Sequence, residues 1–128
     1  MSLDGLRVLV VEDEFLILEL FEFALKLNQA EVRTARSVIE ALKVIESWVP
    51  EIVVTDIGLP ETDGYAFIST LRTKPETRMI PVIALSGYVS LDQKEPEKDE
   101  LLIKIGKPVD PEYLIRILAE KSKQIRGK

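Results

Sequence analysis

The sequence predicts an α/β fold in which a parallel sheet is covered by helices on both faces. Short apolar, β-branched runs alternate with longer stretches of helical periodicity along the whole chain. The runs expected to form the central strands, 8–11 and 52–54, are apolar at every position, as strands buried on both faces require. Such alternation is typical of parallel sheets, because each crossover to the next parallel strand needs a connection long enough to hold a helix.

Five strands and at least four helices are expected. The strands are placed at 6–11, 31–35, 51–56, 80–86 and 101–106. The helices are placed at 14–28, 37–48, 64–74 and 110–125, with a weaker candidate at 91–99. Right-handed crossovers leave few arrangements of these elements, and for a chain of this size they favour the flavodoxin-like (βα)5 three-layer sandwich with strand order 2-1-3-4-5.

Local signals support two helix starts and weaken one helix. Ser37 and Glu40 form a capping box at the start of 37–48. Asp110 followed by Pro111 provides a cap and then a proline at the first helical position. Pro96 falls inside 91–99, where an interior proline costs around 3 kcal/mol, so this segment is expected to be short, shifted or frayed.

Length and composition restrict the class of protein. The 128 residues suit a single domain, which we place at 4–125, with 1–3 interpreted as a cloning remnant and 126–128 as a tail. The net charge of -5, with basic residues scattered among acids, argues against direct nucleic-acid binding. No apolar run is long enough to span a membrane and no signal peptide is recognisable, so no membrane partner and a cytoplasmic location are expected.

The chain contains no cysteine and no histidine. Without cysteine it can form neither a disulfide nor a thiolate metal site, which is consistent with a reducing compartment. Without histidine it lacks the commonest general base and zinc ligand. Any metal ion must therefore be held by oxygen ligands.

Polar side chains follow four of the predicted strands, at the point where each strand ends. Glu12 and Asp13 follow the first, Asp56 ends the third, Ser86 ends the fourth and Lys107 follows the fifth. Because ligands gather at the carboxyl ends of parallel strands, we expect these groups to converge on one rim. A single acid after a strand is ordinarily a cap or turn residue. Capping does not explain four strand ends that supply groups of one chemistry.

This set of groups points to phosphoryl chemistry. Hard oxygen ligands select Mg²⁺, or the similar Mn²⁺. A divalent ion beside Glu12, Asp13 and Asp56 would offset a repulsion of about 4 kcal/mol per pair at close range. Lys107 can pair with an incoming phosphate and Ser86 can donate a hydrogen bond to it. A carboxylate can itself act as the nucleophile and form an acyl phosphate.

Along essentially its whole length the chain resembles the receiver domain of bacterial two-component response regulators. The matching segments are "VLVVEDE" (8–14), "VVTDIGLPETDG" (53–64), "IPVIALSG" (80–87) and "GKPVDPEYL" (106–114). Their order and separations are those of the family. The resemblance therefore rests on several linked motifs rather than on one short pattern.

The resemblance implies a role for each acid at the rim. Asp56 is the phosphoacceptor, and it receives the phosphoryl group from a phosphohistidine on a sensor histidine kinase or a histidine phosphotransfer domain. Asp13 and Asp56 are direct ligands of Mg²⁺, together with the main-chain carbonyl of Gly58. Glu12 matches a metal-site acid that acts through water.

The resemblance also implies how the signal leaves the site. Ser86 follows the phosphoryl group and Lys107 pairs with it. Three further residues match the loop that leads into the third helix: Pro60, Asp63 and Gly64. Phosphorylation then switches the surface formed by 91–99 and the fifth strand. Such a domain takes part in its own phosphorylation, but it is not an enzyme that turns over a free substrate.

Two features depart from the family or extend it. The family usually carries an aromatic residue three positions before the lysine, and here that position is Lys104, which puts an aromatic switch in doubt. The stretch 14–28 is apolar nearly all round, and its core stripe is expected to comprise Leu16, Ile17, Leu20, Phe23, Ala24 and Leu27. Phe15 and Leu18 are expected to lie beyond that stripe, near the acidic rim. They are interpreted either as scattered surface residues or as a docking point for the kinase or phosphotransfer domain.

Other classes of protein remain as alternatives. A phosphatase of the haloacid dehalogenase type needs a second acid two residues after the nucleophile, where this chain has Gly58. A flavodoxin-type cofactor binder needs a phosphate loop after the first strand, where "EDE" would repel phosphate. The strongest rival is a degenerate pseudo-receiver that acts as an interaction module without phosphorylation. Because no output domain follows residue 125, we expect either a stand-alone regulator or the receiver of a hybrid sensor histidine kinase.

Overall fold

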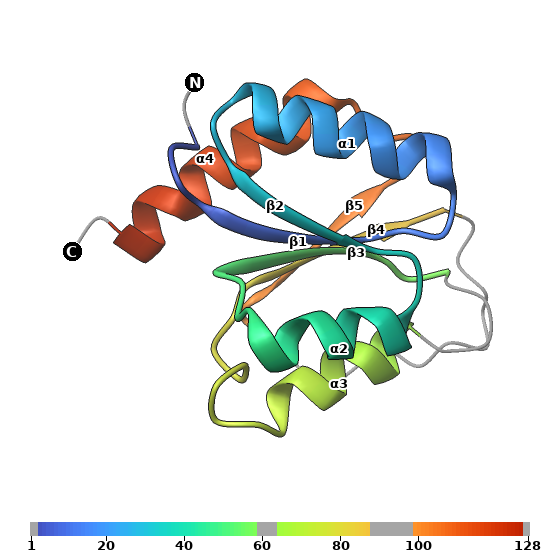
Figure 1. Cartoon of the computed structure of the whole chain (residues 1–128), viewed down its shortest axis with the longest axis vertical. Helices are drawn as coiled ribbons and strands as arrows, with labels where there is room; N and C mark the ends of the chain where they lie inside the picture. Colours follow the sequence, from blue (N-terminus) through green and yellow to red (C-terminus); the bar gives the residue numbers. More distant parts are fainter. Residues whose placement is uncertain (1–2, 59–63, 88–98, 127–128) are drawn as a thin grey trace.

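The protein folds as a three-layer sandwich around one parallel sheet (Figure 1). The computed structural model describes residues 3–58, 64–87 and 99–126. The strands are β1 (Arg7–Val11), β2 (Glu31–Ala35), β3 (Ile52–Asp56), β4 (Val82–Ser86) and β5 (Leu102–Gly106). They lie in the order β2-β1-β3-β4-β5, so the predicted fold class and strand order are confirmed.

Helices cover both faces of this sheet (Figure 1). The helices α1 (Phe15–Leu27) and α4 (Pro111–Arg126) pack on one face, while α2 (Val38–Ser47) and α3 (Gly64–Arg72) pack on the other. The predicted segment 91–99, including Pro96, falls almost entirely outside the described residues. None of the helices that the structure describes is long and apolar enough to cross a bilayer.

Side chains of the central strands alternate between two cores. In β1, Val8 and Val10 point into the core beneath α1 and α4, whereas Leu9 and Val11 point into the core beneath α2 and α3. Every residue of β3 is buried. This burial on both faces explains why the central strands contain no alternation of polar and apolar residues.

Side-chain caps begin α2 and α4 as the sequence predicts. The hydroxyl of Ser37 accepts a hydrogen bond of 3.1 Å from the backbone N–H of Glu40. The carboxylate of Asp110 accepts one of 2.9 Å from the backbone N–H of Glu112. These bonds pair amide groups that a helix start would otherwise leave without partners.

The core-facing stripe of α1 matches the predicted stripe only at Ile17 and Ala24. Its buried residues are Leu18, Phe21 and Leu25, with Ile17 and Ala24 packed against the same core. Four residues that were predicted to face the core are instead exposed: Leu16 (79%), Leu20 (49%), Phe23 (66%) and Leu27 (66%). Because α1 is apolar nearly all round, its sequence fits two stripes, and contacts with the sheet and α4 select between them.

The observed orientation of α1 about its own axis also changes which residues can form the expected docking point. Phe15 is 52% exposed, whereas Leu18 is only 5% exposed. Leu18 is therefore a core residue that a partner protein cannot touch, and the prediction that it lies beyond the core stripe is wrong. Phe15 remains available at the N-terminus of the helix.

Substitutions on the two sides of α1 are expected to differ in their effect on stability. Leu18→Ala should lower the free energy of unfolding by about 2–5 kcal/mol, because it removes buried methyl groups and leaves a cavity. Leu16→Ala should change it by no more than about 0.5 kcal/mol. Urea unfolding of both variants in dilute solution measures the difference. Equal losses of stability would contradict the orientation of α1.

The folded unit extends to Leu3 and Arg126. Leu3 is 1% exposed and belongs to the core. The guanidinium of Arg126 donates to the backbone oxygens of Asp4 and Gly5 and, at 2.6 Å, to the carboxylate of Glu51. Burial opposes ionisation of Glu51, but the hydrogen bonds and charges of Arg126 and Arg7 together outweigh burial and lower the pKa of that carboxyl. Leu3 therefore packs the first described segment into the core, and Arg126 ties the end of α4 to that segment and to Glu51.

Candidate functional site

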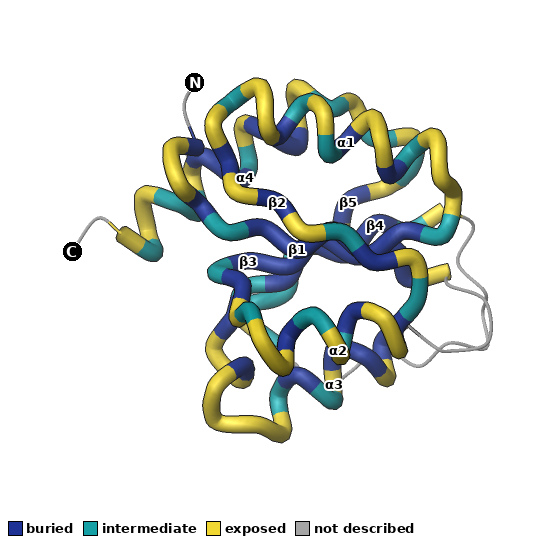
Figure 2. Tube along the Cα trace, viewed as in Figure 1, coloured by how far each residue is buried: buried dark blue, intermediate teal, exposed yellow. Residues whose placement is uncertain are grey.

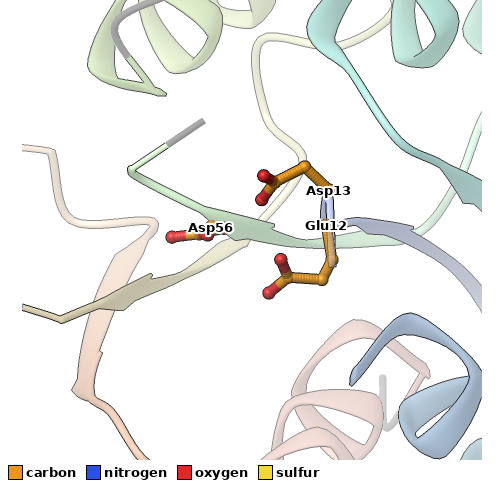
Figure 3. A group of neighbouring side chains, drawn as sticks. All are labelled: Glu12, Asp13 and Asp56. Atoms are coloured by element: carbon orange, nitrogen blue, oxygen red, sulfur yellow. The ribbon is translucent and has the colours of Figure 1, made fainter. Parts of the chain in front are cut away.

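Three carboxylates meet at the carboxyl edge of the sheet and point toward one another (Figure 3). Glu12 and Asp13 follow β1, and Asp56 is the last residue of β3. One oxygen from each lies within 4.8 Å of the others. The site forms because β1 and β3 are hydrogen-bonded neighbours in the sheet, so their ends reach the same rim as the sequence predicts.

Glu12 is the most deeply buried acid of the group. It is 0% exposed, and Asp56 is 4% exposed. Burial raises the pKa of Glu12 to about 7, and the charge of Asp56 adds to the effect, while the bond from the backbone N–H of Glu14 and the charge of Lys107 oppose it. Among the described residues, Oε1 of Glu12 is the one buried side-chain oxygen or nitrogen without a hydrogen-bond partner.

These observations fit a divalent cation. A buried carboxylate oxygen without a partner is costly unless a cation or proton accompanies it. The donor set consists of carboxylate oxygens, which Mg²⁺ and Mn²⁺ prefer. The acids that the sequence singled out are therefore placed where they could hold such an ion together.

Lys107 brings a positive charge into the acidic cluster. Its Nζ atom lies 2.8 Å from Oδ2 of Asp56 and 3.7 Å from Oε1 of Glu12. Partial burial opposes the charged form of this amine, but the hydrogen bond and charge of Asp56, together with the charges of Glu12 and Glu14, outweigh burial and raise the pKa of Lys107 above its ordinary value of 10.5. The side chain therefore stays an ammonium and partly neutralises the acids.

Ser86 and Gly58 also lie at this rim. Ser86 is the last residue of β4, and its backbone oxygen accepts a hydrogen bond of 2.8 Å from the N–H of Lys107. The backbone N–H of Gly58 donates to Oδ1 of Asp56 at 2.9 Å. Asp56 is thus held through both of its oxygens, by Gly58 on one and Lys107 on the other.

The loop into α3 is described only in part. Pro60 and Asp63 lie outside the described residues, and Gly64 is the first residue of α3.

A solvent-open depression of about 620 Å³ lies beside the rim. It is lined by Lys107, Glu14, Ile17, Gly87 and Pro108. A reactive group of a partner protein could reach the rim through this depression.

Arg36 is a rim residue that the sequence interpretation missed. Its Nη2 atom donates a hydrogen bond of 2.9 Å to the backbone oxygen of Asp13. Its guanidinium lies 5.6 Å from the ring centroid of Phe15. The available signal was its position directly after β2, a strand end that was left out when the other four were compared.

Lys104 occupies the position, three residues before Lys107, at which the resemblance leads us to expect an aromatic residue. It lies opposite Ala84 in the pairing of β4 with β5, and it is exposed. Its ammonium is 5.8 Å from the ring centroid of Tyr65, a buried residue of α3. The aromatic ring beside Lys104 thus comes from α3 rather than from β5.

Comparisons with known proteins agree with this fold and rim. The family described as the response regulator receiver domain matches residues 8–119. An uncharacterized 14.6 kDa protein of Leptolyngbya boryana is 32% identical over 120 residues, covering 93% of this chain and 92% of that protein. The transcriptional regulatory protein PrrA of Mycobacterium tuberculosis is 35% identical over 102 residues, covering 77% of this chain but 43% of PrrA.

Solved structures show the same architecture. A response regulator receiver domain protein (CheY-like) from Methanospirillum hungatei JF-1 superposes with a TM-score of 0.82 at 25% identity, covering 97% of this chain and 98% of that one. A response regulator receiver domain protein from Clostridium thermocellum gives a TM-score of 0.80 at 27% identity, covering 93% and 95%.

Fold and site together define a class of α/β signalling domains with an acidic rim at the carboxyl edge of a parallel sheet. The chain belongs to the response regulator receiver domain family of two-component signalling.

Proposed function

We propose that this receiver domain accepts a phosphoryl group on Asp56 from a phosphohistidine in a Mg²⁺- or Mn²⁺-dependent reaction. The proposal rests on the set of charged groups that surround Asp56. Two further carboxylates lie within reach of one shared cation, and the ammonium of Lys107 lies 2.8 Å from Asp56. Positioning and charge neutralisation are the main requirements for phosphoryl transfer.

The chemistry is a transfer of phosphorus from nitrogen to oxygen. An oxygen of Asp56 forms a bond to phosphorus while the bond between phosphorus and the donor imidazole breaks, and the imidazole keeps the electron pair of that bond. The product is an acyl phosphate on Asp56. Lys107 then exchanges its contact with the carboxylate for one with the new phosphoryl oxygens, and the hydroxyl of Ser86 donates a hydrogen bond to them.

The three acids of the rim would each contribute to binding the cation, either directly or through water. Asp13 and Asp56 are proposed as direct ligands together with the main-chain carbonyl of Gly58, and Glu12 is proposed to act through water. When bound, the ion would neutralise charge on the carboxylates and on the transferred group. The unpartnered oxygen of Glu12 supports its membership of the set.

A direct experiment tests the reaction. The protein is incubated with acetyl phosphate or phosphoramidate and Mg²⁺, and the intact protein is weighed by mass spectrometry. One phosphoryl group per chain is expected, and removal of the cation with EDTA should prevent its addition. Absence of any added phosphoryl mass would overturn the proposal. That result would instead favour the degenerate pseudo-receiver. Lys104, which replaces the aromatic residue usual in the family, is consistent with that alternative.

The expected donor is a sensor histidine kinase or a histidine phosphotransfer domain in the cytoplasm. It would approach the rim beside Phe15, whose ring is half-exposed and lies against Arg36, the residue that donates to the backbone oxygen of Asp13. After transfer, the signal would pass to the surface formed by residues 91–99 and β5.

Phe15→Ser is expected to slow phosphotransfer from a histidine donor about tenfold, because it removes one aromatic anchor from the docking surface. It should leave phosphorylation by acetyl phosphate unchanged, since that small donor needs no docking. Ile39→Ser is a matched control, because Ile39 is 66% exposed on α2, which covers the opposite face of the sheet. The two rates are measured by intact mass over time. An unchanged rate with the histidine donor would rule out docking at Phe15.

A further inference from the structure

Four large apolar side chains form a continuous exposed row on α1. The row, called here the α1 seam, consists of Leu16, Leu20, Phe23 and Leu27, which are 79%, 49%, 66% and 66% exposed. Exposed residues follow the outer side of α1 in Figure 2. Scattered exposed leucines are common on proteins, but a contiguous row of them marks an interaction surface.

The spacing within the α1 seam is that of a coiled coil. Successive members are four, three and four residues apart, which is the alternation of a and d positions in a heptad. The residues that pack α1 on its own sheet, Leu18, Phe21 and Leu25, form a separate stripe. The helix therefore has one stripe for its own core and a second stripe with the period that packs against another helix.

The charges beside the α1 seam favour a second copy of the same chain as the partner. Glu19 and Lys26 each precede a seam residue, so both lie on the same flank of the seam, and both are exposed. In an antiparallel pair of α1 helices, Glu19 of each copy lies across from Lys26 of the other. A parallel pair would leave both charges without an opposite charge across the seam.

The apolar residues obey the same symmetry. In the antiparallel pair, Leu20 packs against Phe23 of the second copy, and Leu16 packs against Leu27. A single surface thus complements itself about a two-fold axis, which is the requirement for a closed dimer. Lys26 also lies 2.9 Å from Glu22 of its own helix, but an exposed pair of this kind is weak and yields readily to a new partner.

We infer that the α1 seam is a self-association surface through which two copies of this chain pair as an antiparallel, two-fold dimer. The helix has 13 residues, so the seam is only ~20 Å long. An interface of that size lies at the small end of specific interfaces, below about 1,200 Å². The dimer is therefore weak and depends on protein concentration. It does not require phosphorylation of Asp56.

Sedimentation across low micromolar to millimolar protein tests the dimer. The wild-type chain should shift from monomer to dimer, and Leu20→Asp or Phe23→Asp should raise the dimer dissociation constant about tenfold or more. Ile39→Asp, which changes an exposed side chain of α2, should leave the dissociation constant unchanged. Glu19→Lys and Lys26→Glu should each weaken the dimer, and the double variant should restore it, which a folding defect could not do.

The absence of cysteine from the chain permits a test of orientation. When Leu16→Cys and Leu27→Cys chains are mixed and oxidised, the disulfide should join one variant to the other in preference to either variant with itself. Cysteine at position 39 should cross-link neither chain above background. Cross-links that mainly join Leu16→Cys chains to each other would overturn the antiparallel arrangement.

Two results would overturn self-association: a monomer at every concentration, or a dimer that the seam variants do not affect. If the chain is a monomer and Leu20→Asp slows transfer from a histidine donor, the seam is assigned to a helix of the phosphodonor. Each result is independent of phosphorylation by acetyl phosphate, so failure of the dimer and failure of the proposed function can be told apart.

Discussion

Asp56→Asn is expected to abolish phosphorylation of this domain by acetyl phosphate in the presence of Mg²⁺. The substitution keeps the size of the side chain but replaces the anionic nucleophile with a neutral amide. It also disturbs the local pairing, because Asp56 accepts hydrogen bonds through both oxygens, from Gly58 and from Lys107. An amide has only one accepting oxygen, so one of these donors loses its partner.

The same variant should bind Mg²⁺ about tenfold more weakly or worse, since it removes one of the clustered carboxylates. Intact-mass measurement reports the loss of phosphorylation, and the shift of melting temperature with added Mg²⁺ reports the loss of binding. Asp110→Asn is a matched control, because Asp110 caps α4 without contributing to the acidic cluster and asparagine caps helices equally well. Phosphoryl mass retained by Asp56→Asn would mean that another residue is the acceptor.

Without a divalent cation, the free energy of unfolding is expected to fall as the pH rises through the interval from 4.5 to about 7, the ordinary and folded-state pKa values of Glu12. Burial raises that pKa, so in this interval the folded protein binds more protons than the unfolded chain. Stability then decreases with increasing pH. The full loss attributable to Glu12 is at most about 3 kcal/mol. Urea unfolding across the interval measures it.

Addition of Mg²⁺ should reverse this trend. The cation competes with the proton for the acidic cluster, so its stabilising effect should increase as Glu12 ionises. Glu12→Gln should remove most of both effects, and subtracting its curve from the wild-type curve cancels the titration of all other groups. Parallel curves for the two proteins would show that Glu12 does not carry a raised pKa.

The sheet and the rim could be predicted because they depend on local patterns and on one topological rule. Apolar runs of strand length mark β1 and β3, and each observed strand begins and ends within two residues of its expected place. Parallel strands send their carboxyl ends to one edge. The meeting of Asp13, Asp56 and Lys107 therefore followed from strand ends alone, before any distance was known.

The orientation of α1 and the electrostatics of the rim could not be predicted in this way. Leu18 and Leu16 are equally apolar, and only the combined packing of α1 on β1 and α4 buries the first and exposes the second. The contact of Arg36 with Asp13 and the raised pKa of Glu12 depend on which groups exclude water there. A periodic pattern specifies which residues share one side of a helix or strand. Which side is buried, and which buried acid lacks a partner, depends on contacts between segments far apart in the chain.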